Sequence, residues 1–234
     1  MKKILLPLLI IALLSVSALY RLADSLDEIV ADAIAHHGTV MTQARIGVER
    51  VDIAPKNGKG IISGLLVGNP KGFRTPYALR VERIDLDIDL ATVNKDVTVV
   101  RLLIIDKPDV FYETVDAQTN FDAIQKNIAA YLGPARTKNR GETLLIIEEL
   151  TICNANAQAS APFMGDKTIS IALPDIVLKN VGKARGGVTP AELGQEIVGA
   201  MKAKLSIAGN FERMKKSAGT TLDRAGSAIL GLFK

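Results

Sequence analysis

The first hydrophobic feature of the chain is a run of seventeen residues without a charge, from Ile4 to Tyr20. Lys2 and Lys3 precede this run and Arg21 follows it. Its composition is typical of a membrane-directed segment, although it is slightly short for a helix that crosses the hydrocarbon core. Because lysines come before the run and acidic residues come soon after it, we expect a cytoplasmic N-terminus and export of the rest of the chain.

Two interpretations of this run remain open, a cleaved signal and a retained anchor. The small residues at Val16-Ser17-Ala18 would suit a signal peptidase. Against cleavage, apolar residues recur at helical spacing from Leu22 to Gly38 without an intervening proline. This spacing favours one helix that leaves the membrane and continues outside it.

Beyond Gly38 the spacing of apolar residues changes from helical to alternating. Residues 46–53 and 61–67 predict a β-hairpin, and residues 80–90 predict a strand with apolar residues on one side and aspartates on the other. Residues 97–105 and 110–115 continue this pattern on either side of Asp106-Lys107-Pro108, which we interpret as a turn. The pattern predicts antiparallel strands joined by short turns.

The second half of the chain combines helices and strands. An apolar stripe predicts a helix over residues 120–133, capped by Asn120. After a polar loop at 135–143, strands are expected at 144–152, 168–173 and 176–181, and a helix from Pro190 to about Leu205.

The last segment, from about Phe211 to Phe233, has an amphipathic pattern with basic residues beside the apolar ones. The basic residues that would face a membrane surface are Arg213, Lys215, Lys216 and Arg224. A helix on the membrane surface and a helix packed on the sheet both fit this pattern, and the two interpretations stay open.

The distribution of charge argues against a nucleic-acid partner. The net charge of the chain is +4, but residues 1–21 hold three basic and no acidic residues, and residues 201–234 hold seven basic and two acidic ones. The 19 basic and 23 acidic residues between them give the body a net charge of −4. A mildly acidic body offers no face that would release counterions from a polyanion, whereas basic ends suit anionic lipid head groups.

No sequence pattern favours an enzyme, a cofactor or a metal. Asp85, Asp87 and Asp89 have the spacing of a calcium loop, but Leu90 stands where that loop requires a glycine. On a strand the three carboxylates would point toward water. The single cysteine, Cys153, excludes an internal disulfide and favours a buried thiol over a bond between chains.

Several segments, taken in order, resemble a known family. They are the N-terminal apolar segment and the helix after it, Gly60 to Phe73 with its Gly68-Asn69-Pro70, the alternating strand from Ala78 to Leu90, and Ile104 to Val110. Over residues 1–132 the chain resembles AsmA-like proteins of the bacterial envelope, which are similar to chorein-type lipid carriers. The resemblance implies a curved antiparallel sheet with an apolar concave side for acyl chains, and no catalytic residues.

The resemblance and the residue patterns together predict an α+β fold. We expect an N-terminal membrane helix, a curved, mostly antiparallel β-sheet with an inserted helix, and C-terminal amphipathic helices. The expected divisions are residues 1–38 for the anchor and amphipathic helix, 39–189 for the β domain, and 190–234 for the C-terminal helices. The expected location is the bacterial inner membrane, crossed once, with the bulk of the chain in the periplasm.

The expected function is non-enzymatic binding of phospholipid acyl chains, in envelope lipid homeostasis or outer-membrane assembly. Six apolar residues are the candidates for lining a lipid groove: Ile84, Leu86, Ile88, Leu90, Leu102 and Ile104. Burial of the same residues in an ordinary core stays open as an alternative. A second function also stays open, that of an envelope scaffold that contacts assembly proteins without bound lipid.

Overall fold

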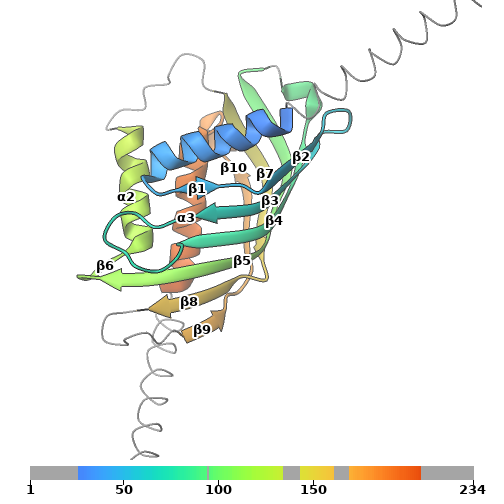
Figure 1. Cartoon of the computed structure of the whole chain (residues 1–234). Helices are drawn as coiled ribbons and strands as arrows, with labels where there is room; N and C mark the ends of the chain where they lie inside the picture. The colour runs from blue at the N-terminus through green and yellow to red at the C-terminus, as the bar shows by residue number, and fades with distance from the viewer. Residues whose placement is uncertain (1–25, 94, 134–142, 161–168, 207–234) are drawn as a thin grey trace, which may run out of the picture.

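The computed structural model describes residues 26–93, 95–133, 143–160 and 169–206. It begins with a helix over residues 26–42, here called the N-terminal helix (Figure 1). The elements that follow are β1 (Ile46–Gly47), β2 (Arg50–Ala54), β3 (Lys59–Val67), β4 (Leu79–Ile88), the short 3-10 helix η1 (Leu90–Thr92), β5 (Val97–Val115), β6 (Gln118–Thr119), α2 (Asn120–Leu132), β7 (Leu144–Cys153), β8 (Asn156–Ser160), β9 (Ile169–Ala172), β10 (Ile176–Val181), the 3-10 helix η3 (Lys183–Arg185) and α3 (Pro190–Ser206).

The strands form one open sheet in the order β1-β3-β4-β5-β7-β10, with β2 also on β3 and with β8 on β5 and β9. The neighbours from β1 to β5 are antiparallel, as expected. The sheet is nevertheless mixed, because β5 pairs in parallel with both β7 and β8. The chain leaves β5, crosses through α2 and returns as β7 in the same direction, which a short turn cannot achieve. The sheet is mostly antiparallel, as expected, and these two parallel pairings make it mixed.

A row of bulges bends the sheet across its middle. Gly64 in β3, Lys107 in β5 and Asn154 between β7 and β8 all have positive φ, at 63°, 50° and 56°. They occupy matching places in the register, beside Glu82 of β4, and each strand there turns two successive residues outward. We call Gly64, Glu82, Lys107 and Asn154 the bulge row. The register of the pairs is the same on both sides of this row, so neighbouring strands share the irregularity and no single strand gains a residue over its partner. Such irregularities raise the local twist and bend the strands together.

The bulge row explains why the predicted turn at Asp106-Lys107-Pro108 is wrong. These residues lie inside one strand of 19 residues, β5. Lys107 has a left-handed backbone conformation, and the strand continues beyond it. Pro108 lies opposite Val81 of β4. A proline is compatible with a strand at a bulge because the ladder is interrupted there.

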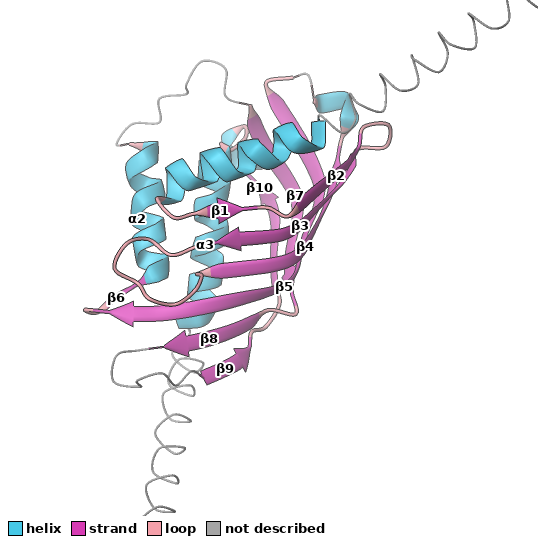
Figure 2. Ribbon diagram, viewed as in Figure 1, coloured by secondary structure: helices cyan, strands magenta, loops and turns pink. Residues whose placement is uncertain are grey.

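The described helices cover one face of the sheet, the concave one (Figure 2). Helix α2 packs against β5, and α3 packs against α2, β7 and β10. Phe121, Ile124 and Ile128 of α2 and Met201 and Leu205 of α3 are buried in one core with the inward residues of the sheet. Much of the concave face is therefore an ordinary packed core.

The helices lie where the sequence predicts them, but some of their ends and caps differ from the prediction. Helices α2 and α3 confirm the two predicted helices within two residues at each end. The cap of α2 is Thr119 rather than Asn120, and it forms a capping box with Asp122. The N-terminal helix passes Gly38 and ends at residue 42. A β-carbon at Gly38 would lie 2.9 Å from the side chain of Ile46, so glycine allows the close approach of these two residues.

The apolar segment Ile4–Tyr20 and the basic candidates Arg213, Lys215, Lys216 and Arg224 lie outside the described residues. In the part of the chain that is described, no helix combines the length and the hydropathy of a membrane span.

Candidate functional site on the concave face

The candidate site is the part of the concave face formed by β3 and β4. The inward residues of both strands are apolar or glycine, and the outward residues of β4 are largely charged. Six of the inward side chains are only partly buried: Ile62, Leu65 and Val67 of β3, and Leu79, Leu86 and Ile88 of β4. We call four of these the apolar strip: Ile62, Leu65, Leu86 and Ile88. By contrast, Val81 and Ile84 on the same face of β4 are 1% and 6% exposed.

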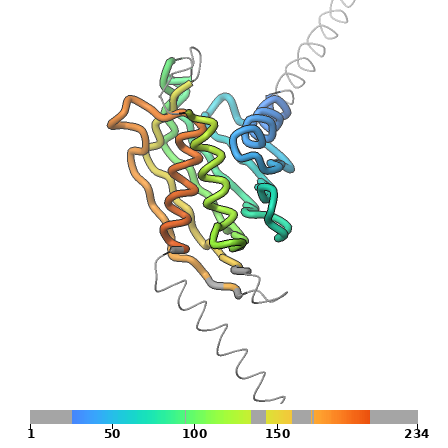
Figure 3. The backbone as a smooth tube through the Cα atoms, turned by 90° about the vertical axis from the view of Figure 1, so that its left-hand side faces the viewer, coloured from blue at the N-terminus to red at the C-terminus, as the bar shows by residue number. Residues whose placement is uncertain are grey.

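The apolar strip lies between two groups of helices in the order of the sheet. Helices α2 and α3 lie side by side over β5, β7 and β10, while the N-terminal helix lies along β1 and β2 at the other side (Figure 3). Strands β3 and β4 come between these two groups in the sheet order. The strip therefore lies between the two groups of helices in the sheet order, and its side chains are only partly buried.

Hydrogen bonds fix the N-terminal helix at both of its described ends. Near its start, Oδ1 of Asp27 accepts a hydrogen bond of 2.9 Å from the backbone N–H of Ile53 in β2. At its C-terminal end, the carbonyl oxygen of Thr42 accepts one of 2.8 Å from Nδ2 of Asn127 in α2. The helix thus borders the strip at a defined position.

Three of the six predicted groove residues share the helix-covered face: Ile84, Leu86 and Ile88. Ile84 belongs to the packed core, while Leu86 and Ile88 belong to the apolar strip. Leu90 does not continue the alternation, since it begins η1 and is 44% exposed.

The assignment of Leu102 and Ile104 to the same face is wrong. In the register of β4 and β5, Leu102 lies opposite Asp87 and Ile104 lies opposite Asp85, so both point outward. Leu103 and Ile105 are the inward residues instead, and both are buried. The sequence around them is apolar on both faces, so only the pairing with β4 fixes the phase of this strand.

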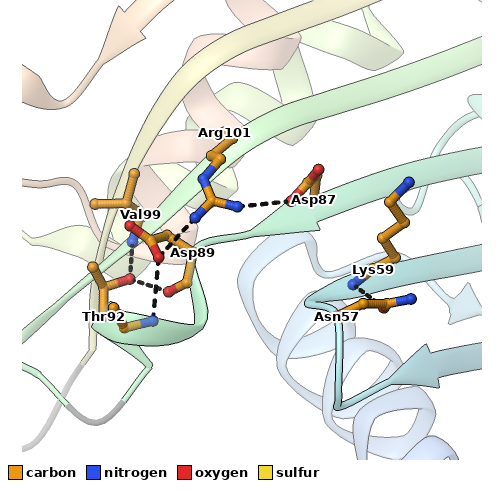
Figure 4. A network of polar contacts seen from close by, with 8 residues as sticks. Asn57, Lys59, Asp87, Asp89, Thr92, Val99 and Arg101 are labelled. Atoms are coloured by element: carbon orange, nitrogen blue, oxygen red, sulfur yellow. Dashed lines mark hydrogen bonds and ion pairs between the residues drawn. The ribbon is translucent and has the colours of Figure 1, made fainter.

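The outer face near the strip carries paired charges rather than a metal site. Arg83 donates to Asp85, and Arg101 contacts Asp87 at 3.5 Å and Asp89 at 2.9 Å (Figure 4). Oδ1 of Asp89 also accepts from the backbone N–H of Ala91 and thereby caps η1. Across the described residues, no group of three or more His, Cys, Asp or Glu side chains is arranged to hold a metal ion.

A buried carboxylate holds the loop between β3 and β4, which contains Gly68-Asn69-Pro70. Glu113 of β5 is 5% exposed and accepts hydrogen bonds of 2.7–2.9 Å from the backbone N–H groups of Arg74 and Thr75 and from the Thr75 hydroxyl. Asn120 donates from Nδ2 to Asn69 Oδ1 at 2.8 Å. These bonds hold the glycine-rich loop against the sheet, and the backbone N–H groups of Gly68, Arg74 and Thr75 all donate within the protein.

Asp109 of β5 is the centre of a second polar cluster, on the outer face. It accepts hydrogen bonds from Tyr77 at 2.5 Å, Asn156 at 3.1 Å and Gln158 at 3.2 Å. Partial burial opposes ionisation of this carboxyl, but these donors and the charge of Arg80 outweigh it, so the pKa of Asp109 lies below its usual value. Burial and the bond to Asp109 raise the pKa of Tyr77. The cluster links β4, β5 and β8.

Sequence reasoning missed Ile62 and Leu65 as members of the strip. Both were assigned to the correct strand, but Gly64 shifts the alternation between them, so no single period of two places both inward. The glycine itself was the available signal, because an isolated glycine in a strand indicates a bulge.

Comparison of the chain with protein-family models, with curated proteins and with solved structures finds no match.

Proposed function

We propose that the protein is a non-enzymatic, membrane-anchored envelope protein that binds lipid acyl chains on its apolar strip. The observation that carries the proposal is the half-buried state of Ile62, Leu65, Leu86 and Ile88 beside a fully packed core. Covering such surface stabilises a complex by about 25 cal/mol per Å² of apolar area removed from water. The resemblance to AsmA-like proteins and the apolar segment Ile4–Tyr20 agree with this function.

The strip favours an acyl chain over a polar ligand because its neighbours offer few polar groups. Along β3 and β4 the inward positions next to the strip are Gly60, Val67, Leu79, Val81 and Ile84. An acyl chain requires only shape and apolar surface, whereas specific small-molecule sites add a few convergent polar groups.

Photo-crosslinking tests this proposal. The full-length chain is placed in vesicles that contain a phosphatidylcholine with a diazirine on its acyl chain, irradiated and digested with trypsin. We expect lipid adducts on the peptide Gly60–Lys71, which carries Ile62 and Leu65. Leu86→Trp should reduce the adducts several-fold by filling the strip. Leu102→Trp, an equal change on the opposite face, is the matched control and should not.

Two results would count against acyl binding on the strip. One is the absence of adducts on Gly60–Lys71 while other peptides are labelled. The other is equal labelling in the Leu86→Trp and Leu102→Trp chains when both remain folded by circular dichroism.

The free edge of β10 favours a second candidate, an envelope scaffold. Among the described strands β10 pairs only with β7, and Val177 on it is 51% exposed. An open edge can add a strand from another protein. Chemical cross-linking in cells that captures a stoichiometric protein partner on β10, without lipid on the strip, would favour this function over the first.

A further inference from the structure

One end of the molecule gathers three segments that are far apart in the sequence. It consists of the start of the N-terminal helix, the turn between β2 and β3, and η1 with the residues after it, and we call it the hairpin end (Figure 1). The bond from Ile53 N–H to Asp27 joins the first two segments. The backbone N–H of Ile88 donates to the carbonyl of Gly58 at 2.8 Å and joins the third.

The hairpin end exposes large apolar side chains. Leu90 is 44% exposed, Val93 is 47% exposed and Ile29, on the first described turns of the N-terminal helix, is 62% exposed. Three lysines, Lys56, Lys59 and Lys95, are exposed in the same region. Together these residues form an apolar tip with exposed lysines beside it.

The named charges of this end do not add up to a basic surface. Arg101 pairs with both Asp87 and Asp89, and Asp27 accepts from the backbone of Ile53. Glu28 and Asp96 are exposed. Arg101 and the three lysines thus face five acidic residues, so the exposed apolar side chains, and not a net positive charge, distinguish the tip.

The position of this end along the chain limits its distance from the apolar segment. Five residues, 21–25, separate Tyr20 from the first described residue, Leu26. Even a fully extended chain spans no more than about 3.6 Å per residue, so Leu26 lies within about 20 Å of the end of that segment. If Ile4–Tyr20 lies in a bilayer, the hairpin end is held near its surface.

We propose that the hairpin end rests on the bilayer, with Leu90 and Val93 inserted among the head groups and Lys56 and Lys95 extending toward lipid phosphates. Apolar side chains gain by leaving water at the interface, and lysines extend their stems toward lipid phosphates. The inference relies on the membrane location of Ile4–Tyr20 but not on acyl binding in the strip.

A fluorescent label reads out this contact. In a Cys153→Ser background, Val93→Cys is labelled with nitrobenzoxadiazole in the full-length chain, which is reconstituted in nanodiscs of phosphatidylcholine and phosphatidylglycerol. We expect blue-shifted emission and several-fold weaker quenching by iodide than for the same label at Gln118→Cys. Gln118 is exposed at the other end of β5 and is the matched control site.

A label at residue 93 that is quenched as strongly as the label at residue 118 would overturn the proposal. Leu90→Asp should restore quenching at residue 93, and persistent protection in that variant would also contradict insertion. Failure of the full chain to enter nanodiscs would remove the anchor and the proposal with it. Crosslinks on Gly60–Lys71 with an accessible residue 93 would leave acyl binding intact while excluding this contact.

Discussion

Asp27 and Ile53 are joined by a side-chain to backbone hydrogen bond of 2.9 Å that attaches the N-terminal helix to strand β2. The carboxylate of Asp27 accepts the backbone N–H of Ile53, near the end of β2, from outside the sheet. Because β2 pairs with β3, the bond fixes the N-terminal helix relative to the strands that carry the apolar strip.

Asp27→Ala should loosen this junction. A hydrogen bond to a charged group contributes on the order of 1–2 kcal/mol, so we expect the Ile53 amide to exchange with solvent roughly tenfold faster. Asp27→Asn keeps an acceptor oxygen and should have a smaller effect. Hydrogen-exchange mass spectrometry of the β2 peptide measures both, and equal exchange in all three chains would show that the bond does not hold the helix.

Glu113 should be among the residues whose loss costs the most stability. Glu113→Ala leaves the part-buried N–H groups of Arg74 and Thr75 without their acceptor, which we expect to cost about 2–3 kcal/mol of unfolding free energy. Glu113→Gln retains one acceptor oxygen and should cost less. Asp96→Ala, at an exposed residue just before β5, is the control. Urea unfolding that ranks Glu113→Ala no lower than Asp96→Ala would contradict this role.

The depressed pKa of Asp109 predicts a contribution to stability that depends on pH. A carboxyl whose pKa is lower in the folded chain stabilises it above the unfolded value of about 3.9, and this contribution disappears as pH falls through the folded pKa. Asp109→Asn should therefore be less stable than the parent at pH 6, and the two should converge as pH falls below the folded pKa. Asp96→Asn, an exposed change of the same type, controls for net charge. Urea midpoints measured between these pH values test the expectation, and a constant gap down to low pH would refute it.

Cys153 should react slowly with thiol reagents in the folded chain. Burial and the nearby carboxylate of Asp106, 3.6 Å from Sγ, raise the pKa of its thiol, so little thiolate is present at pH 8. We expect alkylation by iodoacetamide to be several-fold slower than in urea, and Asp106→Asn to accelerate it in the folded state. Asp116→Asn should leave the rate unchanged. A rate in Asp106→Asn equal to that of the parent would assign the slow reaction to burial alone.

The sequence predicted the elements of this fold better than their pairing. Periodicity located α2, α3 and the strand from Leu79 to Ile88, because each has one apolar and one polar side. Strand β8, Asn156–Ser160, was not predicted because its small polar residues have low strand propensity. It forms as an extension of β7 along β5, a tertiary effect that no local window contains.

The candidate site shows the same limit. Leu86 and Ile88 could be predicted from alternation, whereas Leu102 and Ile104 were placed on the wrong face because both faces of that part of β5 are apolar. Even for the correct residues, the sequence could not separate core from strip. That separation depends on where α2, α3 and the N-terminal helix lie over the sheet.

Gly64 tests whether the bulge row shapes the concave face. Its φ of 63° is a left-handed conformation, and a β-carbon there would clash with the carboxyl end of Glu49. Gly64→Ala should cost about 1–2 kcal/mol of unfolding free energy from backbone strain. Gly47→Ala on neighbouring β1 has nothing within 4 Å of the new carbon and no positive φ, so it should have little effect.

A double variant separates strain from the clash. Glu49 is exposed and can swing aside, so Gly64→Ala with Glu49→Ala should recover little of the lost stability. Full recovery would mean that the Glu49 contact, and not the backbone, sets the cost. If Gly64→Ala were instead no more destabilising in urea than Gly47→Ala, the strand would tolerate a regular backbone there, and the bulge row would not be what bends β3 and turns Leu65 inward.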